Sequence, residues 1–143
     1  MLMNIAIASV LVILTTFIHA ASMAAALRGL GIADAGRQAR DAGSGVAKVM
    51  VVATLALIMF LASMLESALW AATYLSVGAI SDIESSLYFS TVTYTTLGFG
   101  DVVMEPGWRL LSSFQAANGI IMFGWTTALI VAAVQRVYGG HSA

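Results

Sequence analysis

The chain contains no cysteine, a single proline and few charged residues, which account for 9% of its 143 positions. Without cysteine it forms no disulfide framework and offers no thiolate for catalysis or metal binding. The net charge of −1 provides no excess of basic residues for binding nucleic acid. Hydrophobic residues make up 60% of the chain and the mean hydropathy is +0.94. The composition therefore excludes a disordered chain and favours a membrane protein over a soluble globule.

Three apolar stretches are long enough to cross a bilayer, which takes about 20 residues of α-helix. They cover residues 5–27, residues 49–65 with an apolar extension to 77, and residues 110–135. A signal peptide is the alternative for the first stretch, but this stretch is longer than a usual signal core and lacks a preceding basic region. We therefore predict an all-α membrane protein with three transmembrane helices.

The basic residues are concentrated between the first two predicted helices. Four of the six lie in or beside that loop: Arg28, Arg37, Arg40 and Lys48. Because positively charged loops stay in the cytoplasm, we expect a multi-pass protein of the cell (inner) membrane with its N-terminus outside and its C-terminus in the cytoplasm. The glycine-rich composition of residues 29–45 predicts a flexible cytoplasmic loop, with a short surface helix over residues 34–41 as the alternative.

A helix-start pattern lies between the second and third predicted spans. Residues 81–84 read Ser-Asp-Ile-Glu, which fits a capping box in which the Ser81 hydroxyl accepts the Glu84 amide. The helix that follows, residues 82–95, would be roughly 21 Å long, which is too short to span but suits a re-entrant helix that stops midway. Its C-terminal carbonyls carry a partial negative charge, which favours a cation at the centre of the membrane.

A glycine-rich run, Thr-Thr-Leu-Gly-Phe-Gly-Asp, follows at residues 95–101. Lipid does not tolerate irregular backbone, so the run must be buried in protein or line a water-filled path. Gly98 and Gly100 alternate with larger residues, which allows successive carbonyls to face one axis. One copy supplies only one side of an ion cage, so several subunits would be needed. An ordinary turn between membrane helices is the alternative.

The order of outer helix, half-length helix, glycine-rich run and inner helix resembles the pore module of potassium channels. The resemblance covers about residues 49–137. Residues 88–101, Tyr-Phe-Ser-Thr-Val-Thr-Tyr-Thr-Thr-Leu-Gly-Phe-Gly-Asp, match the pore helix and selectivity filter of that family without a gap. The last helix matches in order at Arg109-Leu110-Leu111, Gly119, Phe123-Gly124 and Thr127-Ala128. Residues 1–28 form an additional helix, as in small bacterial proteins of that family.

The resemblance implies a pore domain at residues 46–138. Its parts are an outer helix 46–77, a pore helix 82–95, a selectivity filter 96–100 and an inner helix 108–137, followed by a short tail 139–143. We expect a homotetramer in a lipid bilayer that conducts K⁺ passively. We expect it to be neither an enzyme nor a nucleic-acid-binding protein, and to need no cofactor other than the permeant ion.

The resemblance also implies roles for individual residues. The K⁺-coordinating carbonyls are those of Thr96, Leu97, Gly98 and Phe99, with Gly100 completing the filter. The residues implied to support the filter or its outer mouth are Asp101, Tyr88, Phe89 and Val92, with an Asp101–Tyr88 hydrogen bond expected. The residues implied for the gating hinge and inner cavity are Gly119, Ile120, Phe123, Gly124, Thr127 and Val131. Gly119 and Gly124 also fit simple close packing, and both interpretations can hold.

Four positions depart from the usual pattern of the family. Leu97 replaces valine and Phe99 replaces tyrosine, while Val92 and Phe89 stand where some relatives carry glutamate and tryptophan. These changes affect packing around the filter rather than its carbonyl chemistry. A weakly selective cation channel is therefore one alternative, and a non-conducting membrane subunit is another.

Glu66 is the one acid inside a predicted span. Counted from Lys48, it lies about 27 Å along the second helix, near the expected outer interface. The expected partners there are Arg109, Gln115 and Asn118. We predict either a structural anchor or a residue that tunes the filter or senses external pH. His19 is expected to lie too deep on the opposite side to contact Glu66, as a packing histidine or a proton sensor. Trp70, Tyr74 and Trp108 fit an outer aromatic belt.

Overall fold

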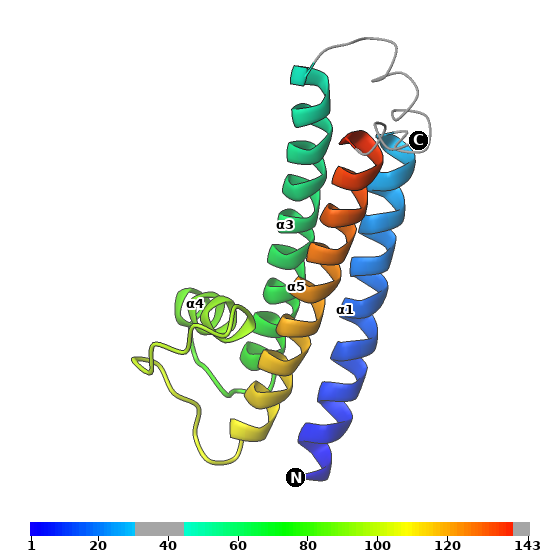
Figure 1. Ribbon diagram of the computed structural model, residues 1–143. Helices are drawn as coiled ribbons and strands as arrows, with labels where there is room; N and C mark the ends of the chain where they lie inside the picture. Colours follow the sequence, from blue (N-terminus) through cyan, green and yellow to red (C-terminus); the bar gives the residue numbers. More distant parts are fainter. Residues whose placement is uncertain (31–44, 139–143) are drawn as a thin grey trace.

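The computed structural model describes residues 1–30 and 45–138, and every regular element in those residues is an α-helix. The elements are α1 (Leu2–Gly29), α3 (Gly45–Ser76), α4 (Ile83–Tyr94) and α5 (Arg109–Tyr138). The three long helices run side by side, whereas the short α4 lies to one side near one end of the bundle (Figure 1). The predicted loop helix 34–41 and the tail 139–143 lie outside the described residues.

The long helices have the length and composition of membrane spans. Their outward faces carry large apolar side chains, such as Phe17 and Phe60, which are 70% and 56% exposed. Such extensive exposed apolar surface is unstable in water but is covered by lipid in a bilayer. The protein is therefore an all-helical, multi-pass membrane protein.

The observed helices begin and end within one residue of the expected ranges 1–28, 46–77, 82–95 and 108–137. The end of α3 has a clear local cause. Gly78 adopts a φ of 69°, and the Ala79 and Gly78 amides donate to the carbonyls of Tyr74 and Leu75 at 2.9 and 3.1 Å. This is a Schellman motif, and it redirects the chain toward α4.

The start of α4 differs from the predicted capping box. Asp82, not Ser81, is the N-cap residue, and its Oδ1 accepts the Ser85 amide at 2.8 Å. The Asp82 backbone is extended, with φ −127° and ψ 154°, which is the conformation that an N-cap requires. Its carboxylate also interacts favourably with the positive end of the helix dipole. The predicted Ser81–Glu84 box is therefore wrong by one residue.

We expect Asp82→Ala to lower the melting temperature of the purified protein at pH 7, whereas Ser81→Ala leaves it unchanged. The Ser85 amide lowers the pKa of the Asp82 carboxyl from its usual value of 3.8. Because the folded-state pKa is the lower one, the cap stabilises fully above the usual value, and the stabilisation is lost as the pH falls through the lowered value. Melting curves of the two variants at several pH values test this. Equal losses from both variants would restore the predicted box.

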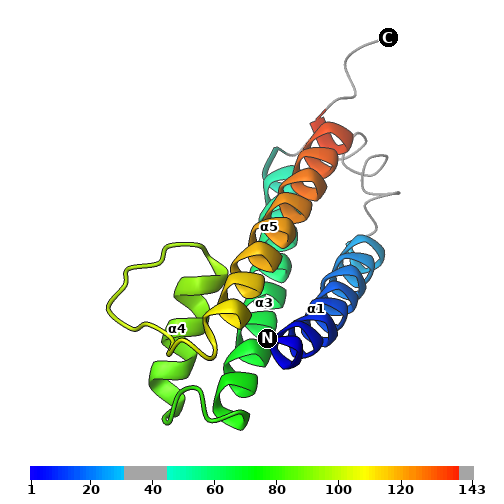
Figure 2. The same cartoon turned by 90° about the horizontal axis from the view of Figure 1, so that it is seen from below.

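The helix α1 packs on α3 and α5, which lie between α1 and α4 (Figures 1 and 2). At its N-terminal end the Asn4 amide donates to the Gly107 carbonyl at 2.7 Å. Gly107 lies in the loop just before α5, so the first turn of α1 is level with that loop. This contact helps to fix the height of α1 relative to α5.

The core of the half of the bundle that carries α4 contains aromatic residues that were predicted to lie at the membrane interface. Trp70 and Tyr74 are fully buried, and the Tyr74 ring packs edge-on against Phe89 with centroids 5.5 Å apart. The aromatic-belt interpretation is therefore wrong for these two residues. α4 covers the face of α3 that the sequence pattern assigned to lipid headgroups.

Candidate functional site

The segment after α4 alternates between two backbone conformations. Thr96, Gly98 and Gly100 have φ values of 60°, 55° and 80°, while the residues between them do not have positive φ. Glycine accepts this region freely, but Thr96 has a branched Cβ and is held there under strain. Strain of this kind concentrates at functional sites, where the surrounding structure maintains it. Residues 96–100 are called the candidate filter below.

The backbone amides and the backbone carbonyls of the candidate filter differ in their hydrogen-bond partners. The Thr96 amide donates to Thr93 O at 3.0 Å, and the Leu97 and Gly98 amides donate to Val92 O at 3.0 and 3.4 Å. No hydrogen bond among residues 1–30 and 45–138 ends on a carbonyl oxygen of residues 96–99. The first three amides are thus satisfied by the last turn of α4, and the carbonyls remain available to a ligand.

The side chains of the candidate filter have little packing within one chain. Leu97 and Phe99 are 61% and 66% exposed, and a Cβ added at Gly98 or Gly100 would meet no atom within 4 Å. Of the residues expected along the inner cavity, Ile120, Thr127 and Val131 are also exposed, whereas Phe123 is half-buried. An exposed apolar face on this side of the chain is suited to contact other subunits.

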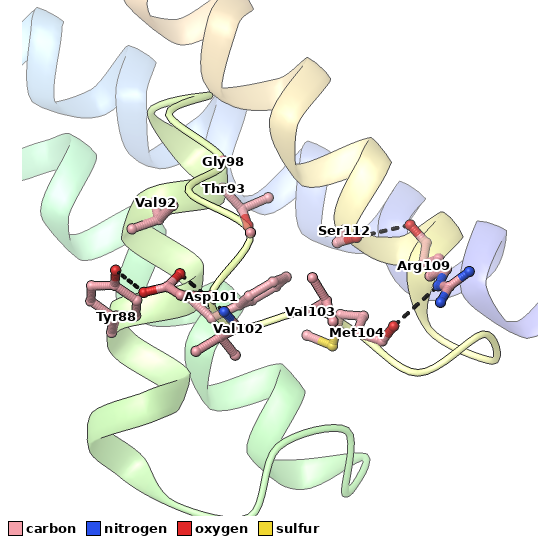
Figure 3. Close-up of a pocket in the computed structure, with 12 residues that line it drawn as sticks. Tyr88, Val92, Thr93, Gly98, Asp101, Val102, Val103, Met104, Arg109 and Ser112 are labelled. Atoms are coloured by element: carbon pink, nitrogen blue, oxygen red, sulfur yellow. Dashed lines mark hydrogen bonds between the residues drawn. The ribbon is translucent and has the colours of Figure 1, made fainter.

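The predicted hydrogen bond between Tyr88 and Asp101 is present. The Tyr88 hydroxyl donates to Asp101 Oδ2 at 2.5 Å, and the Val102 amide donates to Asp101 Oδ1 at 3.0 Å (Figure 3). The bond from Tyr88 holds the pKa of the Asp101 carboxyl below its usual range. A carboxylate therefore lies beside the C-terminal end of the candidate filter at neutral pH.

A cavity of about 310 Å³ lies between α4, the candidate filter and the start of α5 (Figure 3). Val92 lines it where the resemblance suggested a glutamate in some relatives, so this wall is apolar. The predicted site residues that the structure brings together around the cavity are Tyr88, Phe89, Val92, Gly98, Gly100, Asp101 and Arg109. The Arg109 Nε donates to Met104 O at 3.2 Å. Arg109 therefore binds the loop that precedes α5 rather than Glu66.

Polar side chains form hydrogen bonds between the buried face of α4 and the helices α3 and α5. This role was not predicted from the sequence. The Ser90 hydroxyl donates to Ser67 O at 2.6 Å, and the Gln115 amide donates to the Ser90 hydroxyl at 2.6 Å. The Tyr74 hydroxyl donates to Gln115 Oε1 at 2.7 Å. All four side chains are fully or almost fully buried. The sequence feature that could have indicated these contacts is the presence of hydrogen-bonding residues inside otherwise apolar spans.

Glu66 is fully buried and has partners other than those expected. Its Oε1 lies 3.0 Å from His19 Nδ1, and its Oε2 accepts the Tyr94 hydroxyl. The expected partner Gln115 binds Tyr74 and Ser90 instead, and Asn118 donates to Thr15 Oγ1 at 2.9 Å. The predicted separation of His19 from Glu66 is also wrong.

The error in depth has a geometric cause. Glu66 lies about 15 Å before the C-terminal end of α3 at Ser76. α1 begins level with the loop at Gly107, so its residue 19 reaches the same depth. Whether these two residues sense protons stays a prediction.

Gly119 packs directly against α4. A Cβ on Gly119 would lie 2.0 Å from the Tyr94 carbonyl oxygen and 2.9 Å from its carbon. α5 is one continuous helix through this position. Close packing is therefore a property of this structure, and the hinge role stays a prediction. A Cβ on Gly124 would meet nothing within 4 Å.

Comparison with known proteins identifies the larger part of the chain. No curated protein and no solved structure matches it. A family model described as ion channel matches residues 48–136, which include nearly all of α3 and α5, all of α4 and the candidate filter. α1 lies outside the matched region. The chain therefore belongs to this ion channel family.

Proposed function

We propose that the protein is a potassium channel that assembles as a homotetramer and conducts K⁺ passively. Residues 96–99 of four copies would supply rings of backbone carbonyls that replace the hydration shell of the ion. The proposed orientation in the inner membrane places the N-terminus outside and the C-terminus in the cytoplasm. The channel would carry out no enzymatic reaction and would need no cofactor.

The observation that carries this proposal is the backbone of the candidate filter. Its first three amides turn back to α4, its carbonyls accept no hydrogen bond among the described residues, and positive φ recurs at alternate positions. In an extended strand successive carbonyls point to opposite sides, whereas this alternation allows them to face one side. Such carbonyls suit a dehydrated cation, and the C-terminal end of α4 adds favourable negative potential.

The proposed tetramer would cover what a single chain leaves exposed. Leu97 and Phe99 project from the candidate filter, and Ile120 and Val131 project from α5, at 61%, 66%, 62% and 49% exposure. A cation would be enclosed only if several copies face one axis, because one chain presents carbonyls from one side. We expect native mass spectrometry of the purified protein to give four chains per particle. A stable monomer or dimer as the only species would contradict the proposed assembly.

Reversal potentials test the ion selectivity. We expect purified protein in planar bilayers with opposed K⁺ and Na⁺ gradients to give currents whose reversal potential follows the K⁺ gradient. Empty bilayers and bilayers with unrelated membrane protein serve as controls. Equal permeability to the two ions would contradict K⁺ selectivity, and an absence of any K⁺ flux would support a non-conducting subunit instead.

A weakly selective cation channel is the second candidate, and a specific feature favours it. The wall behind the candidate filter is apolar at Val92 and borders a cavity of about 310 Å³. Phe99 also lacks the hydroxyl with which a tyrosine could bond to the pore helix. A filter with fewer bonds to its surroundings would discriminate less between ions. The same reversal potentials distinguish this candidate from the first.

A further inference from the structure

A buried polar cluster joins all four helices beneath the candidate filter. It consists of His19 on α1, Glu66 on α3, Tyr94 on α4 and Thr126 on α5. We propose that Glu66 is a positioning residue for ion selection, which holds the end of the pore helix, and with it the first filter carbonyls, in place through the Tyr94 hydroxyl. This inference rests on the proposed function as a K⁺ channel.

Tyr94 is the link between the cluster and the candidate filter. It is the last residue of α4, so Thr96 follows only two residues later. Its side chain is fully buried, its hydroxyl donates to Glu66 Oε2, and its ring packs edge-on against Phe123 with centroids 5.8 Å apart. Its own carbonyl packs against Gly119. A displacement of the Tyr94 side chain would therefore move the backbone that begins the filter.

Glu66 has both carboxylate oxygens engaged by partners from different helices. Oε2 accepts the Tyr94 hydroxyl, and Oε1 lies 3.0 Å from His19 Nδ1. Both Glu66 and His19 are fully buried. Removing one partner from a buried hydrogen-bonded carboxylate leaves a costly unsatisfied group. The pair therefore resists any rotation of the carboxylate that would release Tyr94.

His19 is itself held from the side of α5. Its Nε2 lies 3.1 Å from the Thr126 hydroxyl, and its ring stacks on Trp125 with centroids 5.5 Å apart. The neutral tautomer with hydrogen on Nδ1 satisfies both contacts, since Nδ1 then donates to Glu66 and Nε2 accepts from Thr126. α1 lies outside the region matched to the ion channel family, yet it completes the support of the pore helix.

Ion selection depends on where the coordinating carbonyls are held. K⁺ and Na⁺ differ in size, and selectivity follows from the spacing, number and field strength of the oxygens around the ion. Thr96 is under backbone strain at a φ of 60°, so it requires support from neighbouring structure to stay in place. The Glu66–Tyr94 bond provides such support from behind. Its loss should change the ratio of K⁺ to Na⁺ permeability rather than only the amount of folded protein.

Two substitutions remove the bond from opposite sides. Tyr94→Phe deletes the hydroxyl and keeps the ring on Phe123, while Glu66→Ala deletes the carboxylate. We expect each to lower the K⁺/Na⁺ permeability ratio by roughly threefold to tenfold, which corresponds to the net contribution of one ordinary hydrogen bond. The double substitution should lower the ratio no further than either single one, because both remove the same interaction. Reversal potentials in bilayers measure all three.

Two further variants separate positioning from general stability. Glu66→Gln keeps an acceptor for Tyr94 and offers an amide to His19 with the other tautomer, so it should recover most of the permeability ratio. Ser63→Ala is the matched control, because Ser63 is buried one turn earlier on α3 and its hydroxyl donates only to Met59 O of its own helix. We expect Ser63→Ala to keep the wild-type ratio.

The outcomes distinguish this inference from the proposed function. If Tyr94→Phe conducts with an unchanged permeability ratio, the positioning role is wrong and the K⁺ channel proposal stands. If Glu66→Ala fails to assemble, Tyr94→Phe alone decides, because it retains the packing of the ring. If wild-type protein conducts without preference for K⁺, the proposed function is wrong, and the inference is overturned with it.

Discussion

Substitution of Gly119 by alanine is expected to destabilise the protein by about 3 kcal/mol or more, at or above the upper end of the usual cost of overpacking. The added Cβ would lie 2.0 Å from the Tyr94 carbonyl oxygen and 3.2 Å from its Cα. These atoms belong to the backbone of α4, so no side-chain rotation can relieve the contact. Either α5 or the end of α4 must move. Thermal unfolding of the purified protein in detergent measures the effect.

Gly124→Ala is the matched control for this substitution. Gly124 lies on the same helix, and a Cβ there would meet no atom within 4 Å. Alanine is also favoured over glycine in a helix by up to about 1 kcal/mol. We therefore expect the Gly124 variant to melt at the wild-type temperature or slightly above it. If both variants keep the wild-type melting temperature and Gly119→Ala only changes channel opening, then Gly119 acts as a hinge rather than as a packing position.

Gly98→Ala is expected to remove K⁺ flux while the protein still folds. Gly98 has a φ of 55° and open space around its Cβ position, so alanine causes no clash. It does cost roughly 1–2 kcal/mol for a left-handed residue with a Cβ. The local backbone can relieve this cost by rotating, which turns the adjacent carbonyls away from the axis. In the proposed tetramer this happens in all four copies, so we expect flux from liposomes to fall to the background of empty vesicles.

Gly107→Ala provides the control for Gly98→Ala. Gly107 also has open space around its Cβ position, but its φ is not positive. It lies in the loop that precedes α5, so we expect wild-type flux and a wild-type elution volume on size exclusion. If both variants lose K⁺ flux, the loss reflects a general disturbance of the loops and does not demonstrate conduction past the Gly98 backbone. Retained flux in Gly98→Ala would contradict conduction through this backbone.

The helix bounds could be predicted closely because their causes are local. Charges at Lys48, Arg109 and Arg136 limit the apolar spans, and Gly78 and Asp82 stop and start helices through their own backbone conformations. The one-residue error at the start of α4 has the same origin. Ser81 and Asp82 are both good capping residues, and only the extended backbone at Asp82 decides between them.

The position of the candidate filter was also evident from the sequence. A capped half-length helix followed by alternating glycines has few alternatives in a membrane chain, because irregular backbone must line a protein-enclosed path there. The Tyr88–Asp101 bond could be expected because both residues lie close in sequence to the filter. Contacts of this kind, between residues near each other in the sequence, can be predicted once the local backbone conformation is known.

Contacts between helices could not be predicted in the same way. Glu66 was expected to bind residues of α5, and it binds His19 and Tyr94 instead. Trp70 and Tyr74 were expected at the lipid interface, and both are fully buried, with Tyr74 packed against Phe89 of α4. The error for Glu66 came from estimating depth along one helix without the height of its neighbours. The error for Trp70 and Tyr74 came from not knowing which face of α3 is covered. Several contacts fix that height for α1, among them Asn4 to Gly107 and His19 to Thr126.

The sequence by itself therefore determined that the chain has three apolar spans, a short helix between the second and third of them, and a glycine-bearing run at residues 95–101. Hydrophobic length, capping residues and glycine positions are sufficient for these features. Only the tertiary structure decided which faces meet and at what depth. Membrane helices are apolar on nearly every side, so their periodicity carries little information about the buried face. The partners of Glu66 and the close approach of Gly119 to Tyr94 depend on that three-dimensional packing.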